Sequence, residues 1–268
     1  MNLSTLIAHI NQKASYLCVG LDTDIEKLPA HLKNDKNAVV KFNRAIIEAT
    51  KDHCVCYKIN TAFYESRGRK GWEDLEETLA LVPKTHFTIA DAKRGDIGNT
   101  SSHYAKAFFE SLDFDAVTVA PYMGEDSVRP FLEYENKFTI VLGLTSNKGA
   151  EDFELLKLDK GPRLYEEVIR KIASWGSPQN LMFVTGATQA TELINIRTII
   201  PDNFLLVPGV GFQGGSLADV TMHGRNKDVG LLVNVSRAII FASKGEDYAE
   251  EARVIAGQYH EEMKRLLG

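Results

Sequence analysis

The feature that most constrains this chain is a strand-then-helix rhythm that repeats eight times. Eight short apolar runs, rich in β-branched and aromatic residues, are each followed by a stretch long enough for a helix. Between the runs, apolar side chains return every three or four residues, for example in 36–51 and 72–82, as in an amphipathic helix. The predicted strands are Tyr16 to Leu21, Cys54 to Ile59, His86 to Ala90, Ala116 to Ala120, Phe138 to Leu142, Leu181 to Val184, Phe204 to Val207 and Leu231 to Val235.

Eight such units predict a single (β/α)8 TIM barrel. The length of 268 residues is close to the usual size of that fold. An open doubly wound sheet would give the same local pattern, but no GxGxxG turn follows the first run. No linker rich in Pro, Gly or Ser and no shift in composition divides the chain. We therefore expect one barrel domain over residues 1–268.

Composition and charge narrow the classes of function. Hydrophobic residues make up 44% of the chain, which is enough for a substantial core and too many for a disordered protein. The net charge of −5 has the wrong sign for a general attraction to nucleic acid. The sequence shows no signal-peptide pattern and no apolar run long enough to cross a membrane. Cys54 and Cys56 are too close to form a disulfide, so we expect free thiols and a cytoplasmic protein. Together with the charge and the apolar runs, this predicts a protein without a membrane or nucleic-acid partner.

Polar residues follow most of the predicted strands at the point where each strand ends. In a TIM barrel the active site lies at this end of the strands. Any one of these residues alone would most simply be a solvated turn residue, but their convergence predicts a site. They are Asp22, Lys58, Asn60, Asp91, Lys93, Thr145, Ser146, Gln213, Ser236 and Arg237.

The period of two along a strand adds geometry to these positions. Lys58 and Asn60 share one face of their strand, and Asp91 and Lys93 share one face of the next. If these are the barrel-facing sets, acidic and basic side chains alternate around one end of the barrel. No histidine or cysteine has the spacing of a metal ligand, so we expect no metal site.

The segment DAKRGDIGNT, residues 91–100, is the sharpest local signal. Lys93 has one carboxylate two residues before it, Asp91, and another three residues after it, Asp96. Nearby negative charge favours the protonated ammonium, which argues against a Schiff-base lysine. We expect Lys93 to act as an acid that delivers a proton to a developing carbanion.

A second signal lies after the last two predicted strands. The turn that begins at Pro208 has the sequence PGVGFQGG and includes Gln213, and the last strand ends in Ser236 and Arg237. A glycine-rich backbone and an arginine that can bind bidentately form the phosphate site that barrels build at this place. The long connections after the fifth and seventh strands, the latter over 209–228, are candidate lids.

These motifs, taken in order, resemble the orotidine 5'-phosphate decarboxylase family, in particular its longer bacterial subgroup. The resemblance rests on CVGLD, YKIN, DAKRGDIGNT, TSN, PGVGFQGG and VSRAI, and it covers the whole chain. It implies decarboxylation of orotidine 5'-monophosphate to uridine 5'-monophosphate and CO2 in de novo pyrimidine biosynthesis. It also implies that neither a metal nor any other cofactor takes part.

The resemblance assigns a role to each motif residue. It implies that Lys93 is the proton donor and that Asp91 lies against the substrate carboxylate. It implies a homodimer with shared active sites, in which Asp96, Ile97 and Thr100 reach the neighbouring subunit's site. Asp22 and Lys58 are implied to hold the ribose hydroxyls and the charge network, with Lys58 counted among the catalytic residues beside Lys93, Asp91 and Asp96. The remaining implied substrate contacts are Ser146 at the pyrimidine, Gln213 and Arg237 at the phosphate, and Asn60, Ile97, Thr100, Thr145, Pro208 and Ser236 beside them.

Two alternatives remain open. The DxKxxD core also occurs in a group of barrels that includes sugar-phosphate decarboxylases, so the first alternative is a metal-dependent decarboxylase or aldolase of sugar phosphates, in which Asp91 and Asp96 would be magnesium ligands. The other alternative is a non-catalytic nucleotide-binding or regulatory barrel. The intact set of Asp91, Lys93 and Asp96 speaks against it.

Overall fold

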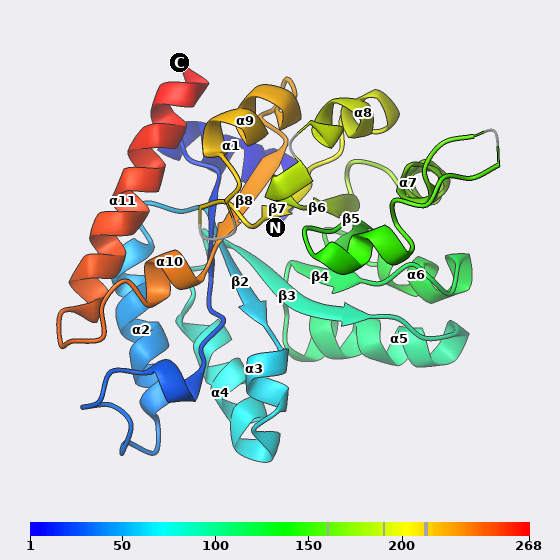
Figure 1. Cartoon of the computed structure of the whole chain (residues 1–268). Coiled ribbons are helices and arrows are strands. Elements are labelled where there is room, and N and C mark those ends of the chain that lie inside the picture. The colour runs from blue at the N-terminus through cyan, green and yellow to red at the C-terminus, as the bar shows by residue number, and fades with distance from the viewer. Residues whose placement is uncertain (160, 190, 212–213) are drawn as a thin grey trace. The chain divides into compact units, whose positions relative to one another are not determined.

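A computed structural model of the chain describes residues 1–159, 161–189, 191–211 and 214–268. Its eight parallel strands follow one another in sequence order and close into a barrel, with helices between them (Figure 1). The predicted (β/α)8 barrel is therefore confirmed, and each predicted run overlaps one strand. The strands are β1 (Leu17–Gly20), β2 (Cys56–Asn60), β3 (Phe87–Arg94), β4 (Ala116–Val119), β5 (Phe138–Leu144), β6 (Leu181–Thr185), β7 (Leu205–Pro208) and β8 (Leu231–Val235).

Internal packing groups the chain into two compact units. The terminal unit comprises Ala8–Ala92 and Asn234–Gly268, and the central unit comprises Met1–Ile7 and Lys93–Val233. The single domain expected over residues 1–268 stays a prediction.

In the terminal unit, helices pack on β1 and on one another. Helix α11 contacts α2, and α2 contacts α4 (Figure 1). The Phe42 ring of α2 stacks on Tyr248 at 5.0 Å between centroids, which joins α2 to the start of α11. The helices of this unit are the C-terminal part of α1 (Leu3–Lys13), the 3-10 turn η1 (Ile25–Lys27), α2 (Ala38–Thr50), α3 (Ala62–Glu65), α4 (Gly68–Leu81), α10 (Arg237–Ile240) and α11 (Tyr248–Leu267).

In the central unit, α5 packs on α6, α6 and α7 pack on β5, and α8 packs on both α7 and α9. A π-helical turn, η2, continues α5 without a break. The helices of this unit are α5 (Gly98–Lys106), η2 (Ala107–Ser111), α6 (Glu125–Leu132), the 3-10 turn η3 (Lys148–Asp152), α7 (Leu164–Ala173), the 3-10 turn η4 (Ala187–Gln189), α8 (Glu192–Ile199) and α9 (Leu217–Gly224).

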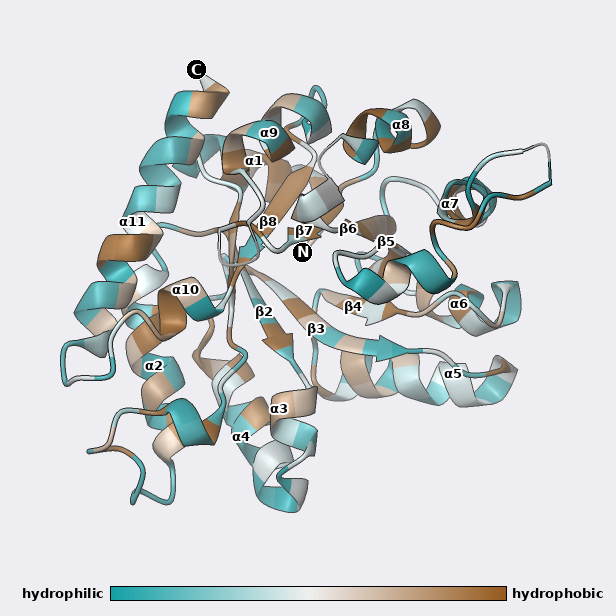
Figure 2. Cartoon of the chain, viewed as in Figure 1, coloured by the Kyte–Doolittle hydropathy of each residue, from teal (hydrophilic) through white to brown (hydrophobic). Residues whose placement is uncertain are grey.

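Strand β3 is longer than its sequence predicted. The apolar run ends at Ala90, and the polar residues after it were expected to form a turn, but the strand continues to Arg94. Tertiary pairing overrides local preference here, because Ala120 N–H donates to Arg94 C=O at 2.8 Å. Figure 2 shows the change along β3 from apolar to polar residues.

The connection after β7, 209–228, was expected to be a long candidate lid. Its second part, Leu217–Gly224, forms α9. Ser216 begins this helix, since its Oγ accepts a hydrogen bond from Asp219 N–H at 3.2 Å. Only 209–216 therefore separates strand from helix, and a lid at this place stays a prediction.

The cysteines behave as expected, since Cys18, Cys54 and Cys56 are all buried and free. Within the described ranges, no helix combines the length and the apolar character needed to cross a bilayer.

Candidate active site

Three of the predicted site residues meet at the C-terminal ends of β1, β2 and β3 in the terminal unit. Lys58 Nζ lies 2.9 Å from Asp91 Oδ2 and 3.3 Å from Asp22 Oδ1. We call Asp22, Lys58 and Asp91 the carboxylate–lysine cluster. The prediction that acidic and basic side chains would gather at this end is thus confirmed for these three residues.

The cluster combines a buried cation with accessible anions. The Lys58 side chain is 4% exposed, whereas those of Asp22 and Asp91 are 17% and 11% exposed. Burial alone would lower the pKa of the Lys58 ammonium, but the two carboxylates outweigh burial and raise it above its ordinary value. Lys58 therefore stays charged and fixes both carboxylates in place.

A buried polar network holds the backbone on either side of Asp22. Tyr64 OH donates to Leu21 C=O at 3.1 Å, and Thr23 Oγ donates to Asn43 Oδ1 at 2.6 Å. Asn43 Nδ2 in turn donates to Tyr64 OH at 2.9 Å, which closes the network. Sequence reasoning missed these supports, because a tyrosine and an asparagine within helices carry no motif.

Ser236 lies against the end of β1. A Cβ atom built on Gly20 would lie 1.9 Å from Ser236 Oγ, so only glycine permits this approach. Asn234, which was not among the predicted site residues, donates from Nδ2 to Ser236 Oγ at 3.2 Å. Arg237, the first residue of α10, is exposed.

Asn60 ends β2 directly opposite Asp91 in the strand register. Its Oδ1 accepts a hydrogen bond from Ala62 N–H at 3.2 Å, which begins the short helix α3. Asn60 therefore shapes the chain where it leaves the sheet beside Asp91.

Lys93 belongs to the polar end of β3 and is exposed. Its φ of +47° lies in the left-handed region, which is uncommon for any residue other than glycine. Strict alternation of side chains cannot be carried through such a residue, so the expected shared face of Asp91 and Lys93 stays a prediction.

The turn after β3 is built around Ser101. Ser101 Oγ donates to Asp96 C=O at 2.7 Å, and Asp96 Oδ1 accepts from Ile97 N–H at 2.8 Å. Thr100 and Ile97 are exposed, with 62% of Ile97 accessible. An apolar side chain this exposed is suited to an interface.

Thr145 and Ser146 follow β5 and are held by other parts of the central unit. Glu154 accepts hydrogen bonds from Thr145 N–H at 2.7 Å and from Thr145 Oγ1 at 2.9 Å. Next to it, Gly186 approaches Ser146 so closely that an added Cβ would lie 2.6 Å from Ser146 Cβ. Sequence reasoning missed Glu154 and Gly186, which fix the direction of this turn.

Pro208 ends β7, and the turn after it needs glycine. Gly209, Gly211 and Gly214 have φ values of +98°, +77° and +88°, which other residues rarely adopt. Gln213 lies outside the described residues, so its predicted contact with phosphate stays a prediction.

Comparison with known proteins decides the family. The family model described as "Orotidine 5'-phosphate decarboxylase / HUMPS family" matches residues 15–252. The chain belongs to this family. An orotidine 5'-phosphate decarboxylase of Flavobacterium johnsoniae is 56% identical over 100% of this chain and 98% of its own length. One from Bacteroides fragilis is 53% identical over the same shares.

Solved structures of the family agree with the sequence relatives. The Leishmania donovani OMP decarboxylase is 35% identical and superposes with a TM-score of 0.82 over 97% of this chain and 99% of its own. The resemblance that the motifs indicated is therefore confirmed.

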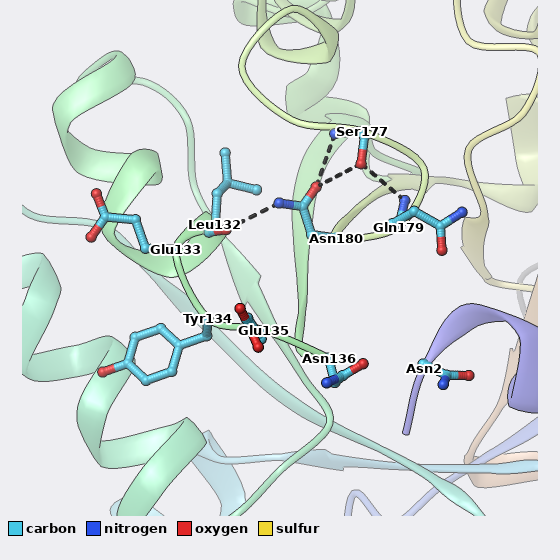
Figure 3. A pocket seen from close by; sticks show the side chains of 9 residues that line it. All are labelled: Asn2, Leu132, Glu133, Tyr134, Glu135, Asn136, Ser177, Gln179 and Asn180. Carbon is cyan, nitrogen blue, oxygen red and sulfur yellow. Dashed lines mark hydrogen bonds between the residues drawn. The ribbon is translucent and has the colours of Figure 1, made fainter.

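The central unit also has a hollow at the N-terminal ends of two of its strands. This hollow, of about 330 Å³, lies where β5 and β6 begin, between Asn136 and Asn180. Figure 3 shows Asn180 accepting from Ser177 and donating to Leu132 C=O, so its amide supports the local loops. None of the predicted site residues lines it.

Proposed function

We propose that the chain converts orotidine 5'-monophosphate to uridine 5'-monophosphate and CO2, a step of pyrimidine biosynthesis. The full-length match to relatives named for this reaction carries the proposal. The carboxylate–lysine cluster supports it, because a fixed anion beside a fixed cation is what a site needs to act on a bound carboxylate.

Asp91 is the residue that faces the scissile carboxylate in this proposal. Lys58 holds it at 2.9 Å, so it cannot turn away when a second negative charge binds. Repulsion between the two carboxylates is relieved as CO2 leaves, which lowers the barrier from the substrate side. Asp22 and Lys58 bind the ribose hydroxyls at the same time.

Lys93 supplies the proton that replaces the carboxylate. As the C6–CO2 bond breaks, the electron pair stays on C6, and the Lys93 ammonium stabilises this charge and then protonates it. The products are uridine 5'-monophosphate, CO2 and a neutral lysine, which regains its proton from solvent. Ser146 contacts the pyrimidine, with Asn60, Thr145 and Ser236 beside the substrate.

The phosphate group is bound by Arg237 and Gln213 next to the turn that starts at Pro208. Arginine binds a phosphate through two parallel hydrogen bonds, which fixes orientation as well as position. We expect this contact to hold the connection after β7 closed over the substrate.

The chain forms a homodimer in which Asp96, Ile97 and Thr100 serve the neighbouring subunit's site. The exposed apolar side chains at the ends of β3 and β4 support this, since Tyr122 is 92% exposed and Met123 is 46% exposed. Mixing inactive Lys93→Ala chains with inactive Asp96→Ala chains should restore activity, because both changes fall in one of the heterodimer's two sites. No recovery after verified subunit exchange would contradict shared sites.

An absorbance assay that follows loss of the orotate chromophore tests the reaction itself. Turnover of orotidine 5'-monophosphate should survive exhaustive treatment with EDTA. Activity that EDTA abolishes and magnesium restores would instead favour the metal-dependent sugar-phosphate enzyme, which the comparisons do not support. Tight binding of uridine 5'-monophosphate without any turnover would favour the non-catalytic alternative.

A further inference from the structure

The backbone of Lys93 needs a support that the motif residues do not supply. Its φ of +47° places the Cβ of an L-residue close to the following carbonyl oxygen. Strained backbone of this kind persists only where surrounding groups hold it. The groups that contact this segment should therefore fix the position of the Lys93 backbone and the direction of its side chain.

One of these groups is the side chain of Thr118 on β4. Lys93 N–H donates to Thr118 Oγ1 at 2.9 Å. Thr118 is 0% exposed, so its hydroxyl is fixed by the packing of the barrel around it. A side chain accepts this bond, so the contact depends on the residue type at position 118.

The residues after Lys93 are fixed to the end of the same strand. Arg94 C=O accepts from Ala120 N–H at 2.8 Å. A Cβ atom on Gly95 would lie 3.0 Å from Ala120 O, so the backbone runs tightly past it. The chain is thus attached to β4 at Lys93 and again directly after it.

We propose that Thr118 is a positioning residue for Lys93, fixing the direction in which its side chain leaves the backbone through the hydrogen bond to its N–H. This rests on the proposed function, in which Lys93 delivers the proton to C6. Proton delivery demands close alignment, and a misplacement of about 1 Å can cost on the order of 100-fold in rate. Thr118 acts through Lys93 and does not itself contact the substrate.

Three substitutions separate the hydroxyl from the shape of the side chain. Thr118→Val keeps the shape and removes the acceptor, Thr118→Ala removes the acceptor without adding bulk, and Thr118→Ser keeps the hydroxyl. Thr139→Val is the matched control, because Thr139 is another fully buried threonine, near the start of β5. Within the described part of the chain, its Oγ1 has no hydrogen-bond partner.

We expect kcat on orotidine 5'-monophosphate to fall about 10- to 100-fold in Thr118→Val and Thr118→Ala. KM and the Kd of uridine 5'-monophosphate should stay within about twofold of wild type, because other residues bind the phosphate and the pyrimidine. Thr118→Ser and Thr139→Val should retain near-native kcat. A merely structural role would not separate kcat from binding in this way.

Several outcomes would overturn the inference. These are native kcat in Thr118→Val, an equal loss in Thr118→Ser or Thr139→Val, and a loss confined to KM. Failure of both Thr118→Val and Thr118→Ala to fold would show that the hydroxyl serves the barrel as a whole, which also contradicts a specific role. Lys93→Ala, assayed in parallel, keeps the two proposals apart. If it stays active, the proton-donor role fails, whatever Thr118 does.

Discussion

The two ends of strands β1 to β3 in the terminal unit differ in the groups that surround their buried ionisable side chains. At the C-terminal end, Lys58 is paired with two carboxylates. At the N-terminal end lies a second set, the histidine cluster, which consists of His9, Lys13, His53, His86 and His260. There His53 Nδ1 lies 3.3 Å from His260 Nδ1, and His86 Nε2 lies 2.8 Å from Lys51 O and 3.4 Å from Lys13 Nζ.

The two ends differ in whether oppositely charged side chains lie beside the buried groups and shift their pKa values. In the histidine cluster, burial is the main cause that lowers the pKa of His9, His53 and Lys13, and it lowers the pKa of His86 to about 4. In the carboxylate–lysine cluster, opposite charges overcome burial and raise the pKa of Lys58. One end therefore holds a charged lysine between two carboxylates, whereas at the other end burial favours the neutral rings of His9, His53 and His86. Substitutions in the carboxylate–lysine cluster should alter the rate of turnover, and substitutions in the histidine cluster should alter the free energy of unfolding.

The largest expected effect is that of Lys93→Ala at the end of β3. We expect turnover of orotidine 5'-monophosphate to be abolished while the fold survives, because the exposed side chain takes no part in core packing. Single-turnover absorbance measurements check the loss of turnover, and a thermal melt checks that the variant is folded. A folded variant with near-native kcat would refute the proton-donor role.

Lys58→Met should have the next largest effect, on the order of 1,000-fold in kcat/KM. It leaves Asp22 and Asp91 without the cation that orients them. Breaking a buried ion pair also costs about 3–5 kcal/mol of stability, and this case should fall at the lower end because both carboxylates are partly accessible. Lys41→Met, which removes an exposed ion pair with Asp35, is the matched control and should change neither rate nor melting temperature measurably.

Arg237→Ala should reduce kcat/KM on orotidine 5'-monophosphate by about 100-fold. A charge-assisted hydrogen bond contributes about 1.5–3 kcal/mol, and here it would also hold a lid. Orotidine, which has no phosphate, should be turned over almost equally by the variant and the wild type. Equal losses on both substrates would show that Arg237 supports the barrel or the chemistry directly.

At the opposite end, acid should destabilise the fold without any specific effect on the active site. His86 has a pKa of about 4 in the folded chain against 6.5 when unfolded, so the unfolded chain binds more protons between these values. Its contribution is therefore complete above pH 6.5 and is lost as the pH falls toward 4, by about 2 kcal/mol between pH 7 and 5. Protonation would place a second cation 3.4 Å from Lys13 Nζ, beside the ring of His9.

Denaturant unfolding at several pH values measures this effect. His86→Gln should flatten the loss of stability between pH 7 and 5, although His9 and His53 still contribute. His103→Gln, a change at an exposed histidine outside the cluster, is the matched control. If His86→Gln does not alter the slope of the free energy of unfolding against pH, the histidine cluster does not stabilise the fold in the way that the comparison of the two ends requires.

The sequence predicted those features that depend on a local pattern of residues. All eight strands were predicted, because each is a run of apolar residues bounded by polar ones. Asp22, Lys58 and Asp91 were predicted to converge, because parallel strands of a barrel end on one side. The extension of β3 and the start of α9 were missed, since long-range pairing and a single serine cap decide them.

What could not be predicted depends on contacts between distant segments. The residues of the histidine cluster are scattered along the chain, so no local motif marks them as a group. Asn43, Tyr64 and Glu154 support site residues from positions that carry no motif. Their roles exist only in the folded barrel.

The close approach of Gly20 to Ser236 has a genetic consequence. One added methyl group at position 20 would collide with the Ser236 side chain, which is small enough to be displaced at some cost. We therefore expect Gly20→Ala to behave as a temperature-sensitive allele in a cell that depends on this chain for its pyrimidines. Such a strain would grow without uracil in the cold and require uracil when warm.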